Sequence, residues 1–448
     1  MRQYNYKTVV IGGGPAGTGL LFNAIKKKEL KDFLETGVAF VEKTGDFVCG
    51  NIGKYIINSD TEGKVFLECL TNAEDILVRN NRTEAITKLI SRYSSSSVPL
   101  QLVGEYLKLL GTGLKEEIEN YSSRLFSRAI AVAIYKTRSG SFFTKIRLTN
   151  HGYQKAWIKS DNVVFAMGGR QSRKDIVNSP VTDALILKKY EQKIMLTDTL
   201  FTNRGLSDAK EMISKNGNKK IVVIGSSHSA LSSINVLLNK LDGICFEEAD
   251  ITLMHRNRFK LFYPSKEQAW LEGYYDFTDK DICPLTQRVY RLGGVRLESR
   301  ELLRKILGLG EEKEMRVRVM NIYPEGGNED ELKNALEQAS LIIPAFGYRP
   351  STVPLYDENG ISVPFSSKNG GCLVNNKCQV MDSAGRAISG LYGIGLASGF
   401  VPSGKLGGEP GFTGQTNGLW LYQNGVGEII YNQIISYAHN SLHLNPVF

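Results

Sequence analysis

The cysteines of this sequence form no recognisable metal-binding or redox pattern. Six are present among the 448 residues, with no C-x-x-C pair and no zinc-ligand spacing. They are Cys49, Cys69, Cys245, Cys283, Cys372 and Cys378. This absence argues against a zinc centre, and it favours a reducing, cytoplasmic setting in which the thiols stay mostly unpaired.

Long apolar runs, a signal peptide and large charge clusters are also missing. No stretch reaches the ~18 apolar residues that a membrane span needs, and the N-terminus leads straight into a predicted strand. The net charge is +9, but Lys and Arg are scattered, with their longest runs at 26–28 and 219–220. We therefore expect no membrane span and no nucleic-acid partner. The sequence leaves a homo-oligomer open.

The sequence does contain two strand–helix–strand patterns, which are typical of nucleotide-binding folds. The first predicts a strand at 7–11, a helix at 15–28 and a strand at 37–42, and the second starts at about 220. Between them lie a largely helical segment at 60–125 and a β-meander from about 127 that returns to the strand VVFAM. Strands in SLIIPAFGYRP and LYGIG and a helix from about Thr416 to Ser436 follow.

Three glycines in the first pattern have the G-x-G-x-x-G spacing of a dinucleotide-binding loop. Gly12 permits the tight turn, Gly14 lets the backbone approach a pyrophosphate, and Gly17 lets helix and strand pack closely. The helix N-terminus then offers unpaired N–H groups to the anion. Glu42 ends the second strand, where an acidic residue accepts hydrogen bonds from a ribose. This pattern predicts a bound dinucleotide.

The second pattern has a degenerate loop, in which Ser227 replaces the second glycine and Ala230 the third after Gly225. The strand that follows ends without an acidic residue, and Arg256 and Arg258 stand there instead. Cations at this place favour the 2′-phosphate of NADPH, with NADH as the alternative. Two such folds in one chain suit two cofactors that exchange electrons.

These motifs resemble those of the flavoproteins that have one FAD-binding and one NAD(P)-binding Rossmann domain. VVIGGGPAG with Glu42 resembles their FAD fingerprint, and GLYGIGLASG their late strand beside the FAD phosphate and ribitol. VVFAMGG and IIPAFGYRP resemble the strand ends at which these chains cross between domains. The resemblance implies an α/β fold: an FAD-binding Rossmann-like domain (1–200 and 336–448) with a β-meander and a helical insertion at about 60–125, plus an inserted, smaller NAD(P)-binding Rossmann-like domain (201–335).

Within this superfamily, the G-x-S-x-S-A loop and the PAFGYRP ending are similar to single-component monooxygenases, including amine N-hydroxylases. The resemblance implies that NADPH reduces FAD and that a flavin hydroperoxide formed from dioxygen oxidises a small-molecule substrate. Two features depart from the pattern. The F-x-G-x-x-x-H-x-x-x-[WY] signature is absent, and Gly395-Leu396 replaces the usual Gly-Asp.

The resemblance also implies the residues that hold each cofactor. For FAD they are Gly12, Gly14, Pro15, Ala16, Gly17, Glu42, Lys43, Val132, Gly168, Gly395 and Gly414. For NADPH they are Gly225, Ser227, Ser229, Arg256 and Arg258. The predicted helix at 416–436 would point its N-terminus at the flavin, where negative charge grows on reduction.

Catalytic residues are much less defined. Asn58, Ser59 and Asp60 could face the flavin or start a helix, and His228 could act as an acid or base or merely pack. One alternative is a disulfide-reductase-like or single-cysteine peroxide or oxygen reductase that uses Cys49, which has no partner cysteine nearby. A non-catalytic flavin-binding regulator is a further alternative. The aromatic-rich segment 261–277 could cover a pocket or form a subunit contact.

Overall fold

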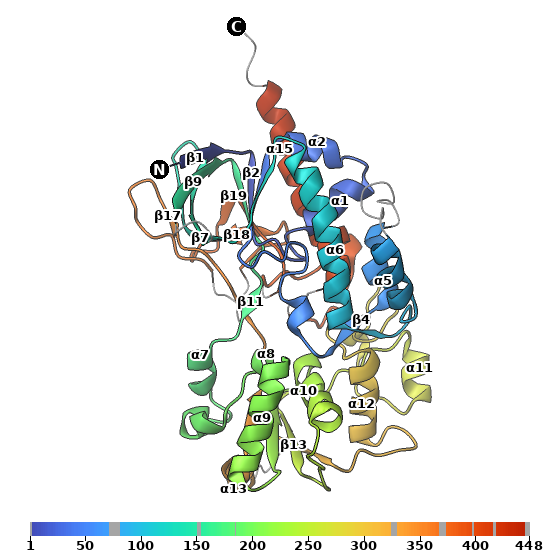
Figure 1. Ribbon diagram of the computed structural model, residues 1–448. Helices are drawn as coiled ribbons and strands as arrows, with labels where there is room; N and C mark the ends of the chain where they lie inside the picture. Colours follow the sequence, from blue (N-terminus) through green and yellow to red (C-terminus); the bar gives the residue numbers. More distant parts are fainter. Residues whose placement is uncertain are drawn as a thin grey trace.

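The computed structural model describes residues 2–70, 81–149, 154–183, 185–323, 329–366, 373–396, 398–414 and 418–443. Cys372 and Thr416 lie outside these residues. We call 2–170 together with 349–443 the larger half and 171–348 the smaller half. Figure 1 shows the larger half above the smaller one, with the C-terminal helix at the top.

A six-stranded sheet forms the centre of the larger half, in the order β18-β19-β10-β2-β3-β6. Its strands are β18 (Gln379–Met381), β19 (Ala387–Gly393), β10 (Asn162–Phe165), β2 (Thr8–Ile11), β3 (Val38–Val41) and β6 (Arg124–Phe126). All neighbours pair in parallel except β18 with β19. β2, β3 and β10 are four-residue apolar strands that are buried throughout, as expected of a sheet covered on both faces.

A second sheet and a set of helices cover the central sheet (Figure 1). The second sheet has the order β1-β9-β8-β7-β17, and its core is the predicted meander. Its strands are β1 (Arg2–Asn5), β9 (Lys155–Ser160), β8 (Phe142–Leu148), β7 (Ala129–Lys136) and β17 (Leu355–Tyr356). The helices are α1 (Gly19–Lys26), α2 (Leu30–Glu35), α3 (Gly63–Leu67), α5 (Asn81–Ser91), α6 (Leu100–Glu119) and α15 (Val426–His443).

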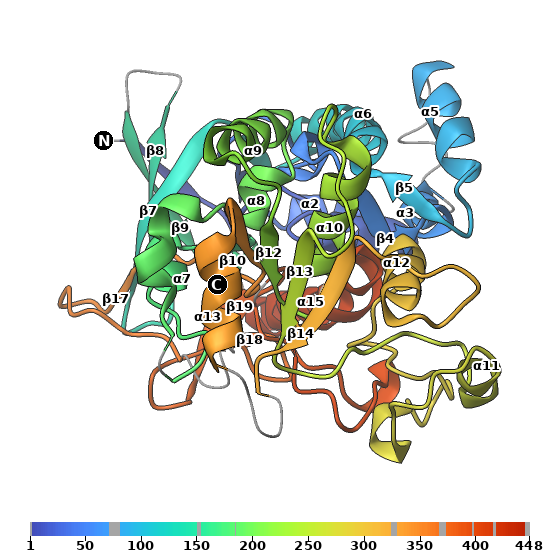
Figure 2. The same cartoon turned by 90° about the horizontal axis from the view of Figure 1, so that it is seen from below.

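The smaller half is a four-stranded parallel sheet in the order β14-β13-β12-β15, with helices on both faces. The strands are β12 (Ile221–Ile224), β13 (Ile251–His255), β14 (Val317–Asn321) and β15 (Leu341–Pro344). Figure 2 shows α9 (Asn203–Asn216) and α10 (His228–Lys240) on one face and α13 (Glu329–Gln338) on the other. The helices α7 (Arg173–Val177), α8 (Thr197–Leu200), α11 (Lys266–Leu271) and α12 (Leu297–Leu307) complete this half.

Alternation along β12 assigns its two faces. Ile221 and Val223 pack in the cluster that contains α9, α10 and α12, whereas Val222 and Ile224 pack in the cluster that contains α7 and α13. β15 pairs with β12 and lies beyond residue 335, where the predicted second nucleotide domain ends. A strand order of this kind places the ligand crevice at the carboxyl end of β12, beside β15.

The chain passes between the halves twice, and both passages meet. β11 (Gly169–Arg170) pairs antiparallel with β16 (Arg349–Pro350), so one short ribbon carries both crossings. Beside it, the Asp198 carboxylate accepts hydrogen bonds from the Tyr348 hydroxyl at 2.6 Å and the Tyr55 hydroxyl at 3.3 Å. β4 (Asn58–Glu62) and β5 (Ser97–Pro99) form a separate ribbon.

Several predicted elements are confirmed with shifted ends. α1 starts at Gly19 and not at Pro15, because residues 14–18 form a separate turn in which the Thr18 hydroxyl bonds the Gly14 carbonyl. The predicted helix at 416–436 has a π-helical turn at Leu421–Gly425, continues as α15 and extends past residue 436. The helical insertion is confirmed over α3, α5 and α6 but also contains β5.

Candidate active site

The first glycine loop joins β2 to α1 and forms an open cradle of backbone amides. A Cβ on Gly17 would lie 2.0 Å from the Gly12 carbonyl oxygen, and one on Gly12 would lie 2.3 Å from that of Ala166. A Cβ on Gly14 would come no closer than 3.6 Å to another protein atom. Two of the glycines are therefore required by the protein's own packing, and the third leaves space for a ligand.

The amides of this loop are free to bind an anion. In the described part of the chain, the N–H groups of Gly14, Ala16 and Gly17 donate to no protein group, whereas that of Gly12 bonds the Val41 carbonyl at 2.9 Å. Unpaired amides before an eight-residue helix, with space above Gly14, fit the pyrophosphate of a dinucleotide.

Glu42 lies at the end of β3 and is held by the turn that follows it. Its carboxylate accepts hydrogen bonds from the Thr44 amide and hydroxyl, both at 2.7 Å, and from the Gly45 amide. An ionised carboxylate has about four acceptor sites, so this fixed group retains capacity for one ribose hydroxyl. Lys43 beside it is exposed.

Three other predicted FAD residues lie in three separate segments of the larger half. Gly395 follows β19 and meets the first loop, because a Cβ on it would lie 2.8 Å from that of Ala16. Val132 stands at a β-bulge between Ala131 and Ala133, where the β7–β8 pairing shifts and backbone groups leave the ladder. Gly168 lies in the passage after β10, and its carbonyl accepts the Ser351 amide at 3.0 Å.

Pro15 is half-buried in the turn before α1, and Gly414 lies in the passage towards the late helix. The late helix packs on α1, because a Cβ on Gly19 would lie 2.4 Å from the Tyr422 carbonyl oxygen. Burial raises the pKa of the Tyr422 hydroxyl. A hydrogen bond from the Gly418 amide lowers this pKa, and the Asp60 charge raises it. Tyr422 was not singled out from the sequence, because an aromatic residue in an apolar helix resembles an ordinary core residue.

The second glycine loop joins β12 to α10 and repeats part of this design. Gly225 has a φ of +150°, and a Cβ on it would lie 3.0 Å from the Ala345 carbonyl oxygen. The amides of Ser227 and Ser229 donate to no protein group in the described residues, and the Ser227 side chain caps no helix N–H. This fits a second anion at the N-terminus of α10.

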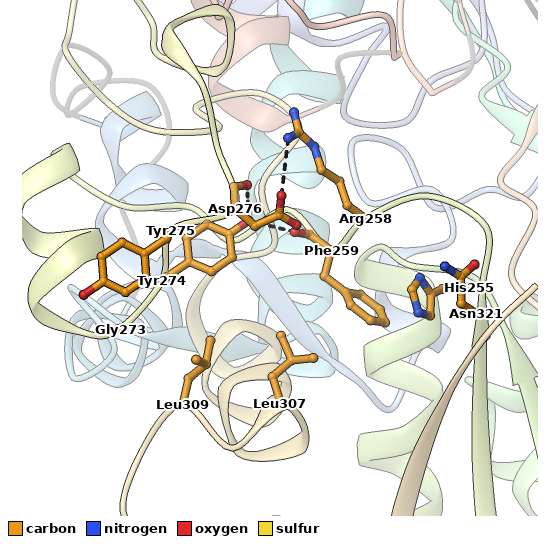
Figure 3. A pocket seen from close by; sticks show the side chains of 10 residues that line it. All are labelled: His255, Arg258, Phe259, Gly273, Tyr274, Tyr275, Asp276, Leu307, Leu309 and Asn321. Carbon is orange, nitrogen blue, oxygen red and sulfur yellow. Dashed lines mark hydrogen bonds and ion pairs between the residues drawn. The ribbon is translucent and has the colours of Figure 1, made fainter. Parts of the chain in front are cut away.

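A cavity of about 380 Å³ lies beyond this loop at the carboxyl ends of β13 and β14 (Figure 3). His255 and Asn321 are the last residues of these strands, and the His255 ring packs on Phe259 with centroids 4.3 Å apart. Other residues that line it are Arg258, Gly273, Tyr274, Tyr275, Asp276, Leu307 and Leu309. The position and size fit the adenosine end of a dinucleotide bound at α10.

The predicted phosphate-binding arginines are already engaged. Arg258 pairs with Asp281 at 2.7 Å and with Asp276 at 3.4 Å. Arg256 donates to the carbonyls of Pro180 and Val181, both at 3.2 Å. Of the two, Arg258 lines the cavity and Arg256 does not.

Cys49 is buried against α6, at 1% exposure. Burial raises the pKa of its thiol, and Cys49 is free of any disulfide. The side chain lies beside Gly104, since a Cβ on that glycine would come within 3.5 Å of the sulfur. A buried thiol with a raised pKa lacks the exposed thiolate character of a redox cysteine.

The polar residues of β4 reach the smaller half. Asn58 donates to Glu298 at 2.6 Å, and the Ser59 hydroxyl bonds the Thr61 carbonyl at 2.5 Å and is buried. Asp60 lies 4.0 Å from the Nε2 atom of His228. The predicted helix start at 59 or 60 is wrong, because these residues form a strand and α3 begins at Gly63.

His228 is the first residue of α10 and faces both halves. Its Nε2 atom lies 3.3 Å from the Gly294 carbonyl, and its Nδ1 atom is buried without a partner in the described structure. Burial lowers the pKa of His228, against the opposing effect of Asp60. The imidazole is therefore kept neutral and does not supply a permanent charge to Asp60.

A buried carboxylate that no sequence pattern marks ties the halves together. Glu409 is 5% exposed and accepts hydrogen bonds from the amides of Leu292 and Gly293 at 2.8–3.0 Å. Nearby, Arg291 donates to the Leu406 carbonyl at 2.8 Å.

Segment 261–277 belongs to the core of the smaller half through Leu261 and Tyr263, although its residues Trp270, Leu271 and Tyr275 are exposed.

Cys283 belongs to the same contact between the halves. Burial opposes ionisation of its thiol, but hydrogen bonds from Thr286, Gly408 and Arg291 lower its pKa to about 6.

In the described residues, no group of three or more His, Cys, Asp or Glu side chains is placed to hold a metal ion. The same residues contain no helix that is long and apolar enough to cross a membrane.

One characterised relative aligns with almost the whole chain. The sequence is 28% identical over 435 residues to the CMP-5′-(3-aminopropyl)phosphonate hydroxylase of Streptomyces rubellomurinus, which covers 96% of this chain and 98% of the relative. This relative is named as a hydroxylase, which agrees with the predicted oxidoreductase activity.

Solved structures show the same fold at low identity. The ornithine N-hydroxylase of Kutzneria sp. 744 is 12% identical with a TM-score of 0.54, covering 97% of this chain and 100% of that one. The cadaverine monooxygenase of Erwinia amylovora is 12% identical with a TM-score of 0.54, covering 99% and 96%. The bacillithiol disulfide reductase of Staphylococcus aureus is 11% identical with a TM-score of 0.50, covering 97% and 99%.

The sequence also matches the family described as pyridine nucleotide-disulphide oxidoreductase, over residues 6–395. This match spans both glycine loops and both passages between the halves, and it ends at the late Gly395. It confirms the predicted α/β fold class and the predicted superfamily of FAD- and NAD(P)-dependent oxidoreductases. The chain belongs to the pyridine nucleotide-disulphide oxidoreductase family.

Proposed function

We propose that this protein is an FAD-dependent monooxygenase that uses NADPH and dioxygen to hydroxylate the amine of an anionic small molecule. The alignment with a hydroxylase over 96% of the chain carries this proposal. The named substrate of that relative carries an amine together with phosphonate and phosphate groups. The overall change is RNH₂ + O₂ + NADPH + H⁺ → RNHOH + NADP⁺ + H₂O.

The two glycine loops divide the binding of the cofactors. We propose that the amides of Gly14, Ala16 and Gly17 hold the FAD pyrophosphate and that Glu42 holds its ribose. FAD, when bound, carries electrons from NADPH to dioxygen. The Ser227 and Ser229 amides and the N-terminus of α10 would hold the NADPH phosphates, with its adenosine in the cavity beside His255 and Arg258. We propose residues 171–348 as the NADPH-binding domain and the rest as the FAD-binding domain.

The contact between the halves would exclude water from the reacting atoms. Glu409 and Arg291 join the late segment of the larger half to residues 283–294 of the smaller half at a fixed place. Exclusion of water protects reactive intermediates from side reactions.

We further propose a cytoplasmic location, which follows from the reduced cysteines.

Stepwise reduction and reoxidation test the proposed function. The purified, FAD-loaded protein is reduced with NADPH without air, and oxygen is then admitted with CMP-5′-(3-aminopropyl)phosphonate present. We expect a product heavier by one oxygen atom, detected by mass spectrometry, and NADPH consumption coupled to it. Hydrogen peroxide as the only oxygen product, with and without the substrate, would contradict the proposal.

The Cys49→Ser variant separates this proposal from the cysteine-based reductase. Because the Cys49 thiol is buried with a raised pKa, we expect the variant to be reduced by NADPH and reoxidised at unchanged rates. Loss of turnover with retained FAD would favour the reductase instead.

A further inference from the structure

Asp60 presents a carboxylate at the contact between the halves without a permanent counter-ion. Its side chain is 56% exposed, and the only cationic type of residue within 4.0 Å of it in the described structure is His228. Burial lowers the pKa of that imidazole, so it is mostly neutral near pH 7. The hydroxyl of Thr61 donates to Asp60 at 3.2 Å. Most of the acceptor capacity of this carboxylate therefore remains unused.

Arg296 presents the opposite charge from the other half. The guanidinium lies over the Phe262 ring at 4.6 Å and donates to the Arg291 carbonyl, and no carboxylate lies within 4.0 Å of it in the described structure. Burial lowers the pKa of Arg296, and so do the nearby charges of Arg288 and Arg291, whereas the charges of Asp60 and Glu409 oppose this lowering. A partly buried cation without a carboxylate in direct contact is costly to keep.

The two charges lie on adjoining segments of the two halves. The Nε2 atom of His228 lies 4.0 Å from the Asp60 carboxylate and 3.3 Å from the carbonyl of Gly294, two residues before Arg296. The Asp60 carboxylate also opposes the lowering of the Arg296 pKa. The larger half therefore contributes the anionic group, and the smaller half contributes the cation.

The segments that carry these charges are firmly held. Glu298 accepts hydrogen bonds from Asn58 of β4 at 2.6 Å and from Asn235 of α10, so it bridges the halves. Glu298 is two residues from Arg296, and Asn58 is two residues from Asp60. Leu297, between Arg296 and Glu298, has a φ of +49°, which is strained for a leucine. Such fixation keeps Asp60 and Arg296 apart instead of allowing them to collapse into an ion pair.

We propose that Asp60 and Arg296 determine substrate specificity: Asp60 binds the substrate's amine, and Arg296 binds its phosphonate or phosphate group. This assignment rests on the proposed function. Two unlike charges that come from different halves and form no ion pair match a ligand that carries both charges at its two ends. Arg288 and Arg291 add positive charge on the Arg296 side, which suits a substrate with more than one anionic group.

Calorimetric titration of the FAD-loaded protein with two probes tests both roles. The first probe is CMP-5′-(3-aminopropyl)phosphonate, and the second is the same compound with a propyl group in place of the aminopropyl group. Asp60→Asn should weaken binding of the first probe by about tenfold to a hundredfold and leave the second unchanged. Arg296→Gln should weaken binding of both probes by a similar factor, and Arg296→Lys should restore part of the loss.

Matched controls come from neighbouring exposed charges. Glu62→Gln lies on the same strand as Asp60, and Lys305→Gln lies on the helix that follows Arg296; both residues pair with exposed partners. Neither control should change the dissociation constant of either probe. FAD content and melting temperature, measured for every variant, separate a binding defect from misfolding.

Three outcomes would overturn the assignment. They are an equal loss of both probes in Asp60→Asn, unchanged probe binding in Arg296→Gln, and a loss in Arg296→Gln confined to NADPH, which would assign this arginine to the cofactor phosphates. Probe binding that depends on both charges, without formation of a hydroxylated product, supports the assignment and overturns the proposed function instead.

Discussion

The two glycine loops share a backbone design and differ in their side chains. Gly12 and Gly225 both follow the first strand of their sheets and are both crowded by a carbonyl from the adjacent strand end. The first loop then continues with Gly14 and Gly17, whereas the second has Ser227 and Ala230. Bare amides can approach a pyrophosphate closely, whereas serine hydroxyls add hydrogen bonds at the expense of that approach.

The difference suits two cofactors with different residence times. A flavin that stays bound through turnover benefits from close backbone contacts, and the late Gly395 meets this loop beside Ala16. A nicotinamide cofactor must be exchanged, and the second loop stands beside a cavity that opens at the strand ends (Figure 3). Substitutions in each loop should therefore have effects of different kinds and sizes.

The largest effect should come from Gly17→Ala. Its Cβ would lie 2.0 Å from the Gly12 carbonyl oxygen, within a helix–strand contact that cannot move without disrupting β2. Overpacking of this type costs about 3 kcal/mol or more. We expect a markedly lower melting temperature even in the absence of FAD. Gly310→Ala serves as the control, because a Cβ there would meet no other atom within 4 Å. A melting temperature within 2–3 °C of the parent, roughly the shift for 1 kcal/mol at this size, would contradict the packing role.

Gly14→Ala should affect the ligand without affecting the fold. A Cβ there meets nothing closer than 3.6 Å, so the apoprotein should keep its melting temperature. The added side chain would occupy the space proposed for the FAD pyrophosphate, and we expect FAD affinity to fall by about a hundredfold or more. The measurement is FAD fluorescence during titration of the apoprotein. Unchanged FAD binding would remove the distinction between the roles of Gly14 and Gly17.

Ser227→Ala should weaken NADPH binding and leave FAD content unchanged. The Ser227 side chain caps no helix N–H, so its loss should cost little stability. A hydrogen bond to a charged phosphate contributes about 1.5–3 kcal/mol, which corresponds to roughly tenfold or more in the dissociation constant. Stopped-flow reduction at varied NADPH concentrations measures it, with the exposed Ser214→Ala as the control. An unchanged dissociation constant would mean that Ser227 only packs.

Much of the fold could be predicted from local patterns. The glycine spacing in VVIGGGPAG identified β2, the turn and α1 because the same three residues meet strand, ligand and helix constraints within one turn. The four-residue apolar strands β2, β3, β10 and β12 were visible because each is buried on both faces. Such signals are local in the sequence.

The contacts between the halves could not be predicted in the same way. Glu409 bonds Leu292 and Gly293, more than a hundred residues away, and no local pattern marks either partner. Arg258 was predicted from its place after a strand, but its pairing with Asp281 depends on a turn that brings Asp281 back from 23 positions along the chain. Arg296 and Tyr422 were missed because both are influenced by the charge of Asp60, which is far from them in the sequence.

The smallest effect should come from Asp276→Asn, and it tests how the second site discriminates between nicotinamide cofactors. Asp276 lines the cavity and lies 3.4 Å from Arg258, so it partly neutralises the cation proposed to bind the 2′-phosphate. Asp281, at 2.7 Å, is buried and should be left intact because it also accepts hydrogen bonds from Thr278. Removing one exposed charge at this distance is worth about 0.2–1 kcal/mol. We therefore expect the ratio of kcat/KM for NADPH over NADH to rise by roughly two- to fivefold, mostly through KM for NADPH. The rise should disappear in 1 M salt, since exposed charges are then screened within about 3 Å. A fall in that ratio would show that Asp276 helps to bind the ribose, and Arg258 would then serve the fold of this segment and not the phosphate.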